Sequence, residues 1–186
     1  MDLKEILHRI HNKKLYYSNN EELMEVQLNC MKKLYEFNET YPWELDKREK
    51  LLKEMFAEMG ENCYIEPPLR ANWGGKNVHL GNTVYANFNL TLVDDTDIFI
   101  GNNVLIAPNV VISTGTHPIH PEIRRKQGQY NASVRIGNNV WIGAGSIVTK
   151  DIPSDVVAVG NPCRVLRKIE QRDYEYYYKD MKVDID

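Results

Sequence analysis

Three seven-residue stretches decide the fold of this chain: VHLGNTV at 78–84, IFIGNNV at 98–104 and VRIGNNV at 134–140. Each contains two aliphatic residues around a variable one, then Gly-Asn, a polar residue and Val. From each stretch onward an aliphatic or small residue returns every six positions, at 80, 86 and 92, at 100, 106 and 112, and at 136, 142 and 148. A period of six suits neither an amphipathic helix nor an ordinary strand, and it is typical of parallel β-helices.

Such a repeat has a simple geometric meaning. Six residues form a short strand and a turn, three sides complete one coil, and the repeated aliphatic residue points into the prism. The Gly-Asn pairs are expected at corners, because both residues tolerate left-handed backbone angles at little cost. The sequence therefore predicts a mainly β protein, with a parallel β-helix domain over 61–167 and an inserted loop at 113–133.

Residues 1–60 have a helical pattern instead. Ser18 and Glu21 have the spacing of a capping box. An apolar stripe follows at spacings of three to five residues: Leu23, Val26, Met31, Leu34 and Phe37. Pro42 suits the first turn of a second helix and Gly60 its end. Because this segment is too small for a robust core of its own, we expect it to pack on the β-helix.

Length and composition restrict the class of protein. The 186 residues suffice for one medium domain with an appendage. No stretch approaches the ~20 continuous apolar residues of a membrane helix, and the amino terminus lacks the apolar core of a signal peptide. A net charge of −3 does not favour nucleic acid as a partner, and three widely spaced cysteines indicate neither a disulfide framework nor a zinc cluster. We expect a cytoplasmic protein without membrane or nucleic-acid partners.

The inserted loop carries the motif that points to a family. NVLIAPNVVISTGTHPIHP at 103–121, GNPCR at 160–164 and the hexapeptide repeats together resemble the maltose and galactoside O-acetyltransferases. YEFN at 35–38 and YANFN at 85–89 are also similar to that family. The resemblance covers nearly the whole chain. It implies a left-handed β-helix, a homotrimer, and acetyl-CoA bound as cosubstrate in a groove between subunits, with no metal.

The resemblance implies that His117 is catalytic. Its task would be to take the proton from a sugar hydroxyl as that oxygen attacks the thioester carbonyl, and imidazole, with a usual pKa near 6.5, suits this task. The alternative is a loop histidine packed beside Pro118. For His120 a structural use is favoured, and a metal site made of these two histidines lacks a clear third ligand.

Four more positions match acceptor contacts of the family. Asp95 and Asn87 would bind sugar hydroxyls, and Asn87 would also steady the transition state. Asn72 matches a short polar sugar-binding residue, and Ser18 aligns with an acceptor contact in a region where the family varies. Without the resemblance, Asn87 would be a corner residue and Asp95 a solvated turn.

Six residues would form the cofactor side: Trp141, Ala144, Thr149, Lys150, Arg164 and Arg167. Backbone groups near Ala144 would hold the thioester and pantetheine, and one amide would stabilise the oxyanion. Lys150 and the two arginines would face the nucleotide phosphates. The alternatives are intersubunit packing for Trp141 and a solvated strand or helix end for the arginines.

The chain departs from the family at one place. In relatives a further coil with a PGVTIG segment separates the matches to 136–143 and 144–153, whereas here the two parts join directly, so about one coil of roughly 18 residues is missing. Loss of a whole coil keeps the inward phase, but it brings the cofactor residues nearer to His117 by about 4.8 Å, one strand spacing. The tyrosine-rich tail at 168–186 is expected to cap the end of the β-helix, or else to touch a neighbour.

Three functions follow from these patterns. The first is an acetyl-CoA-dependent O-acetyltransferase of maltose, glucosides or galactosides, acting by direct attack without an acyl-enzyme. The second is a non-catalytic β-helix module that binds a sugar or a partner, because the shorter solenoid would misplace CoA. A metal-dependent hydratase on the same fold is the weakest, since the histidine ligands are missing.

Overall fold

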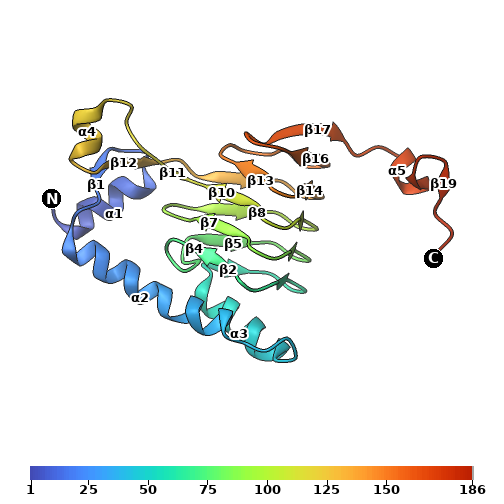
Figure 1. The fold of residues 1–186 in the computed structure, drawn as a ribbon, viewed down its shortest axis with the longest axis horizontal. Helices are drawn as coiled ribbons and strands as arrows, with labels where there is room; N and C mark the ends of the chain where they lie inside the picture. The colour runs from blue at the N-terminus through green and yellow to red at the C-terminus, as the bar shows by residue number, and fades with distance from the viewer. Residues whose placement is uncertain (186) are drawn as a thin grey trace.

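The computed structural model describes residues 1–185, and most of them form a three-sided, left-handed parallel β-helix (Figure 1). The first face contains β2 (Glu58–Met59), β5 (Val78–Leu80), β8 (Ile98–Ile100) and β13 (Val134–Ile136). The second contains β3 (Tyr64–Ile65), β6 (Tyr85–Ala86), β9 (Leu105–Ile106), β14 (Val140–Ile142) and β16 (Val156–Val159). The third contains β4 (Arg70–Ala71), β7 (Thr91–Val93), β10 (Val111–Ser113) and β15 (Ile147–Val148). The β-helix predicted from the repeat is confirmed.

The repeated aliphatic positions form the core of the prism. All nine residues spaced by six are buried, and the most exposed of them, Leu80, is 6% exposed. Strands of one face are in parallel register, so Leu80, Ile100 and Ile136 stack directly on one another. The period of six thus builds one continuous apolar column, as predicted.

At the corners between the first and second faces, the expectation that the Gly-Asn pairs adopt left-handed backbone angles was wrong. Left-handed backbone angles occur one residue after each Gly-Asn pair, at Thr83, Asn103 and Asn139, and again at Asp155 of the last coil. The glycines are needed instead because successive coils lie very close together at this corner. A Cβ on Gly101 would clash with Asn138 and with the backbone of Gly137 in the next coil. The asparagine of each pair links coils, since Asn102 N–H donates to Asn138 Oδ1 at 2.8 Å.

Three helices precede the solenoid: α1 (Leu3–His11), α2 (Glu21–Asn38) and α3 (Leu45–Met55). Leu23, Leu34 and Phe37 of the predicted apolar stripe are buried. Figure 1 shows α2 and α3 beside the first coil, and side chains of both helices, including Phe37 and Leu52, join the same core as the inward column. The helical segment therefore closes the amino-terminal end of the prism.

The predicted helix ends were wrong in three places. Asn20, not Ser18, caps α2, because Asn20 Oδ1 accepts from Leu23 N–H at 2.9 Å. Pro42 lies in the turn before α3, which begins only at Leu45. Gly60 lies inside the first coil and does not end a helix, because the chain leaves α3 at Met55 and immediately enters β2.

The inserted loop is an ordered hairpin. Its strands β11 (Gly115–Thr116) and β12 (Gly128–Asn131) pair antiparallel around the short helix α4 (Pro121–Arg125). β1 (Tyr16–Tyr17), from the connection between α1 and α2, adds a third strand to β12. The amino-terminal segment therefore supports the loop as well as the solenoid end.

The carboxyl-terminal end also differs from expectation. β17 (Arg164–Lys168) pairs antiparallel with β16 and covers the edge of the last coil. The tyrosine-rich tail, with α5 (Arg172–Glu175), β18 (Tyr176–Tyr178) and β19 (Met181–Lys182), extends away from the solenoid (Figure 1). Within residues 1–185, the last backbone hydrogen bond from this end to the solenoid is Ile169 N–H to Asp155 O. The prediction that the tail caps the β-helix was wrong, because β17 satisfies that edge first; Asp186 lies outside the described residues.

The shortened solenoid closes in phase. Ile136 bridges to Ile152, and Trp141 pairs with Val157, so the coil after the loop stacks directly on the last one. The expectation that removal of a whole coil preserves the prism is confirmed. In the described part of the chain, no helix is long and apolar enough to span a membrane.

Candidate active site

His117 lies on the loop hairpin, directly after β11. Its Nδ1 is 2.9 Å from the carbonyl oxygen of Gly128 on β12. A carbonyl can only accept, so Nδ1 carries the proton and donates it. In the neutral ring this bond selects the tautomer that leaves Nε2 unprotonated, and the residue is exposed.

Asp95 lies on the turn between β7 and β8, and it is only 4% exposed. Its Oδ1 accepts from Asn72 Nδ2 at 2.6 Å and from Trp73 Nε1 at 3.1 Å, while Oδ2 accepts from Gln129 Nε2 at 3.0 Å. Burial raises the pKa of Asp95, and these three donors oppose the rise. Asp95 is therefore not the solvated turn residue of the alternative reading.

Asp94, next to it, fixes the neighbouring turn. It is fully buried, and its two oxygens accept from the backbone N–H groups of Trp73 at 2.7 Å and Gly75 at 2.9 Å. Burial raises the pKa of Asp94 to about 6 in spite of these donors. Because the Trp73 turn also carries Asn72, Asp94 sets the position of one of the four candidate sugar contacts.

The amino-terminal segment contributes Ser18 to the same region. Ser18 N–H donates to the carbonyl of Gln127 at 3.2 Å, one residue before the carbonyl that holds His117. Behind it, Asn131 Nδ2 donates to the hydroxyl oxygen of Tyr16 at 3.2 Å. Burial raises the pKa of Tyr16, so this hydroxyl stays neutral. Ser18, Asn72, Asp95 and His117 are thus gathered at the edge between the third and first faces.

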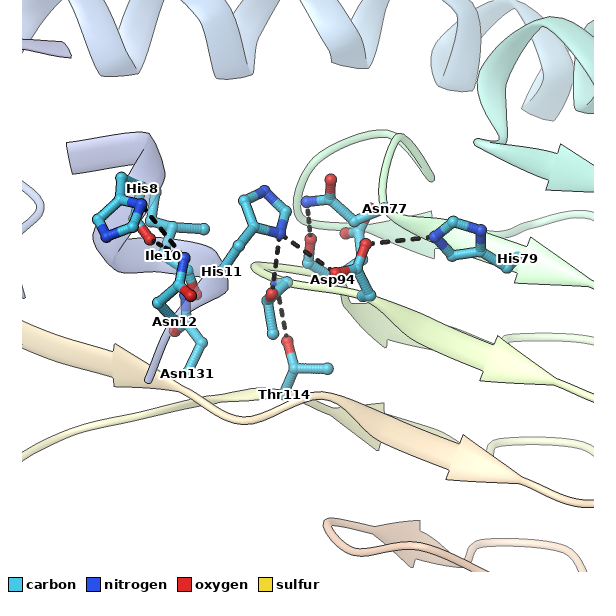
Figure 2. Close-up of polar contacts among 11 residues, drawn as sticks. His8, Ile10, His11, Asn12, Asn77, His79, Asp94, Thr114 and Asn131 are labelled. Carbon is cyan, nitrogen blue, oxygen red and sulfur yellow. Dashed lines mark hydrogen bonds and ion pairs between the residues drawn. The ribbon is translucent and has the colours of Figure 1, made fainter. Parts of the chain in front are cut away.

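Two further histidines fasten α1 and β5 to this edge. His11 Nδ1 lies 3.2 Å from Asp97 Oδ2 and 3.1 Å from Thr96 Oγ1, and His79 Nε2 lies 3.2 Å from Asp97 Oδ1. Figure 2 shows His11 and His79 on opposite sides of the turn that contains Asp94. Asp97 therefore ties the turn from both sides, two residues from Asp95.

Asn87 lies elsewhere. It follows β6 at the edge between the second and third faces, and its Oδ1 accepts from the next backbone N–H, that of Phe88, at 2.7 Å. The whole third face separates this edge from Asp95, about five strand residues or on the order of 15 Å. A single chain does not bring Asn87 to His117.

The candidate cofactor residues are likewise divided. Thr149 and Lys150 follow β15 at the edge of Asp95, whereas Trp141 and Ala144 belong to the second face and its following corner. Trp141 is 53% exposed, and the outward side chain of Leu105 lies beside it on the neighbouring coil. Both sets are exposed and lie on coils beyond the His117 loop.

The two arginines of this set differ. Arg167 forms two hydrogen bonds to Asp173, with Nη1 at 2.7 Å from Oδ2 and Nη2 at 2.8 Å from Oδ1. This pairing raises the pKa of Arg167 and lowers that of Asp173. Arg164 is exposed and bonds only to the carbonyl of Cys163 at 2.7 Å, so its charge faces no carboxylate among the described ion pairs.

The structural use expected for His120 is confirmed. It caps α4, where its Nδ1 accepts from Glu122 N–H at 3.3 Å. Among residues 1–185, no three His, Cys, Asp or Glu side chains are arranged to hold a metal ion.

Sequence patterns missed several residues that position the candidate site: Trp73 and Gln129, which bond to Asp95 directly, and Asp94 and Tyr16, which support its surroundings. Trp73 directly follows Asn72 and Asp94 directly precedes Asp95, so their places in the sequence could have indicated a supporting role. Gln129 and Tyr16 carried none, because their roles depend on the pairing of β1 with β12 across more than 100 residues.

Curated relatives agree closely with this chain. The galactoside O-acetyltransferase of Lactococcus lactis is 48% identical over 196 aligned positions, covering 96% of this chain and 95% of that protein. The galactoside O-acetyltransferase of Escherichia coli K12 is 50% identical over 194 positions, covering 95% of each. Because 96% of this chain is about 179 residues, the alignment to the Lactococcus protein holds about 17 positions without a counterpart here, which is about one coil.

Solved structures and a family motif give the same assignment. Residues 9–60 match the maltose acetyltransferase hexapeptide capping motif. A galactoside acetyltransferase in complex with coenzyme A has a TM-score of 0.85 at 47% identity over the full length of both chains. A maltose O-acetyltransferase from Clostridium difficile 630 has a TM-score of 0.80 at 39% identity, covering 89% of this chain and 97% of that one. The chain therefore belongs to the hexapeptide-repeat sugar O-acetyltransferase family, and it is an acetyl-CoA-dependent acetyltransferase.

Proposed function

We propose that this enzyme acetylates a hydroxyl of a galactoside, glucoside or maltose acceptor, with His117 as the general base. The observation that carries the proposal is the Nδ1–H bond of His117 to Gly128 O, because it leaves Nε2 ready to accept a proton. Asn72 and Asp95 supply amide and carboxylate groups suited to sugar hydroxyls on the same edge of the prism. The names of the relatives support this class of acceptor.

His117 then has two tasks. Nε2 takes the hydroxyl proton while the sugar oxygen bonds to the thioester carbonyl carbon, so the oxygen becomes a usable nucleophile. As the carbon–sulfur bond breaks, the imidazolium returns that proton to the departing thiolate. The products are the acetylated sugar and free CoA thiol, with no acyl-enzyme.

We further propose that the working unit is a homotrimer. The proposal is supported by the position of Asn87, which lies on a different edge from His117, so that Asn87 from one subunit would meet His117 from the next. The exposed Trp141 and Ala144 would then line one wall of the groove between subunits, and Thr149 and Lys150 the opposite wall. The exposed Lys150 and Arg164 fit a nucleotide with phosphates, whereas Arg167 is occupied by Asp173.

Release of CoA thiol tests the function. Purified protein is mixed with acetyl-CoA and a panel of galactosides, glucosides and maltose, beside His117→Ala and His117→Gln. Loss of the base should lower kcat by about 10²–10⁴-fold, whereas binding of CoA by calorimetry should be unchanged. His120→Ala, which removes only a helix cap, is the matched control.

Two results would contradict the proposal. Equal thiol release by the wild type and His117→Ala would exclude His117 as the base. Absence of CoA binding would favour the alternative, a β-helix module made non-catalytic by its missing coil. The cytoplasmic location expected from the sequence stays a prediction.

A further inference from the structure

Gln129 of β12 lies between the two groups that the proposed function uses. Its Nε2 donates to Asp95 Oδ2 at 3.0 Å and to Asn131 Oδ1 at 3.3 Å. An amide nitrogen has two protons, so both are used and the orientation of the amide is fixed. In the described chain the amide oxygen Oε1 has no hydrogen-bond partner, and the residue is half-buried.

The loop hairpin approaches Asp95 closely at this point. A Cβ on Gly115 of β11 would overlap Asp95 Oδ2, so only glycine allows the hairpin to lie against the carboxylate. Asp95 Oδ1 already has two donors, whereas Gln129 is the only donor to Oδ2 among residues 1–185. A carboxylate oxygen accepts two hydrogen bonds, so Oδ2 can receive one more donor.

We infer that Gln129 is a specificity-determining residue for the acceptor. It holds Asp95 so that Oδ2 receives one sugar hydroxyl, and it presents its own Oε1 to a second hydroxyl of the same sugar. This inference rests on the proposed function and extends it to a residue on the His117 hairpin. The acceptor class it selects is a pyranoside with two neighbouring hydroxyls that both donate.

The first test compares Gln129→Asn with Gln127→Asn. The shorter side chain at 129 cannot reach Asp95, whereas the side chain of Gln127 is exposed and its left-handed φ of 60° suits asparagine. With the best acceptor of the thiol-release panel, used as its methyl glycoside, Gln129→Asn should raise the acceptor KM about ten-fold and leave the acetyl-CoA KM unchanged. The control should match the wild type in both.

Monodeoxy analogues of that glycoside separate a contact from a merely structural role. For the wild type, removal of the hydroxyl that meets Oε1 should raise KM about ten-fold; for Gln129→Asn the same removal should have no further effect. A structural role would raise KM equally for every analogue.

Gln129→Glu provides a pH-dependent readout. A glutamic acid can donate to Asp95 only while protonated, so the ratio of its acceptor KM to that of the wild type should rise with pH as the pair of carboxyls ionises. The other ionisable groups that face Asp95 are Asp94, Tyr16 and His117, and they are common to both proteins.

The outcomes separate the two claims. If the wild type is active and requires His117 while Gln129→Asn keeps its acceptor KM, or loses affinity equally for all analogues, the inference about Gln129 is overturned and the proposed function stands. If the wild type releases no thiol with any acceptor, both are overturned.

Discussion

The substitution Thr83→Asn should stabilise the protein. Thr83, Asn103, Asn139 and Asp155 occupy the same corner of successive coils, with φ between 55° and 61°. Left-handed angles are unfavourable for a β-branched residue and are tolerated by asparagine. Side-chain hydrogen bonds also link this corner from coil to coil: Asn103 Nδ2 donates to Asn139 Oδ1 at 3.1 Å, and Asn139 Nδ2 donates to Asp155 Oδ1 at 2.7 Å. We call this row of hydrogen bonds the corner ladder.

The size of the effect follows from two contributions. A left-handed angle costs an ordinary residue roughly 1–2 kcal/mol, of which replacement of threonine should recover about 1 kcal/mol. Asparagine at 83 would also extend the ladder by donating to Asn103 Oδ1, and an exposed hydrogen bond of this kind adds about 0.5 kcal/mol. The expected gain is about 1.5 kcal/mol in the free energy of unfolding, or a rise in Tm of about 3–6 °C for a chain of this size.

Urea unfolding followed by circular dichroism measures this gain, at one protein concentration because self-association would shift the midpoint. Thr83→Gly relieves the backbone strain without adding a hydrogen bond to the corner ladder, so its free energy of unfolding should be lower than that of Thr83→Asn. Asn103→Thr makes the reverse change and should lose about 1.5 kcal/mol. A Thr83→Asn protein no more stable than the wild type would refute the reasoning, since strain and ladder would then both be negligible.

Three further predictions concern buried groups. Burial raises the folded pKa of Asp94 from 3.8 to about 6, so the stability contributed by its protonated form is full only below pH 3.8 and is lost as pH rises through 6. The free energy of unfolding should therefore fall from pH 4 to pH 7 by up to about 3 kcal/mol more in the wild type than in Asp94→Asn. Phe37 is fully buried, so Phe37→Ala should cost about 3–5 kcal/mol, while Tyr35→Ala, at a 66% exposed site on the same helix, should cost under about 0.5 kcal/mol in the same urea assay. Tyr16→Phe leaves the amide of buried Asn131 without its hydroxyl partner and should cost about 1–3 kcal/mol in thermal unfolding, with an unchanged midpoint contradicting the role given to that bond.

The solenoid could be predicted from the sequence because each coil repeats one physical requirement. Positions such as Ile100 and Ile136 point into a narrow prism, so only aliphatic or small residues fit, and the period survives in the chain. The corner chemistry was only half predicted. Glycine recurs there because neighbouring coils almost touch, whereas the left-handed angle belongs to the residue after the Gly-Asn pair. Either requirement is compatible with a Gly-Asn pair, so the sequence does not distinguish them.

Contacts between distant segments could not be predicted in the same way. The capping box at Ser18 and the true cap at Asn20 are two residues apart and both chemically suitable, and the pairing of β1 with β12 decides between them. Gln129 belongs to no repeat and no motif, so only the hairpin geometry reveals its bond to Asp95.

The separation of Asn87 from His117 has a genetic consequence. In the proposed trimer each active site would combine two gene products, His117 of one chain and Asn87 of the next. A cell with one allele carrying His117→Ala and another carrying Asn87→Ala would then assemble mixed rings, and every mixed ring would contain one interface where both residues are intact. Two inactive alleles would complement each other, although neither encodes a working chain.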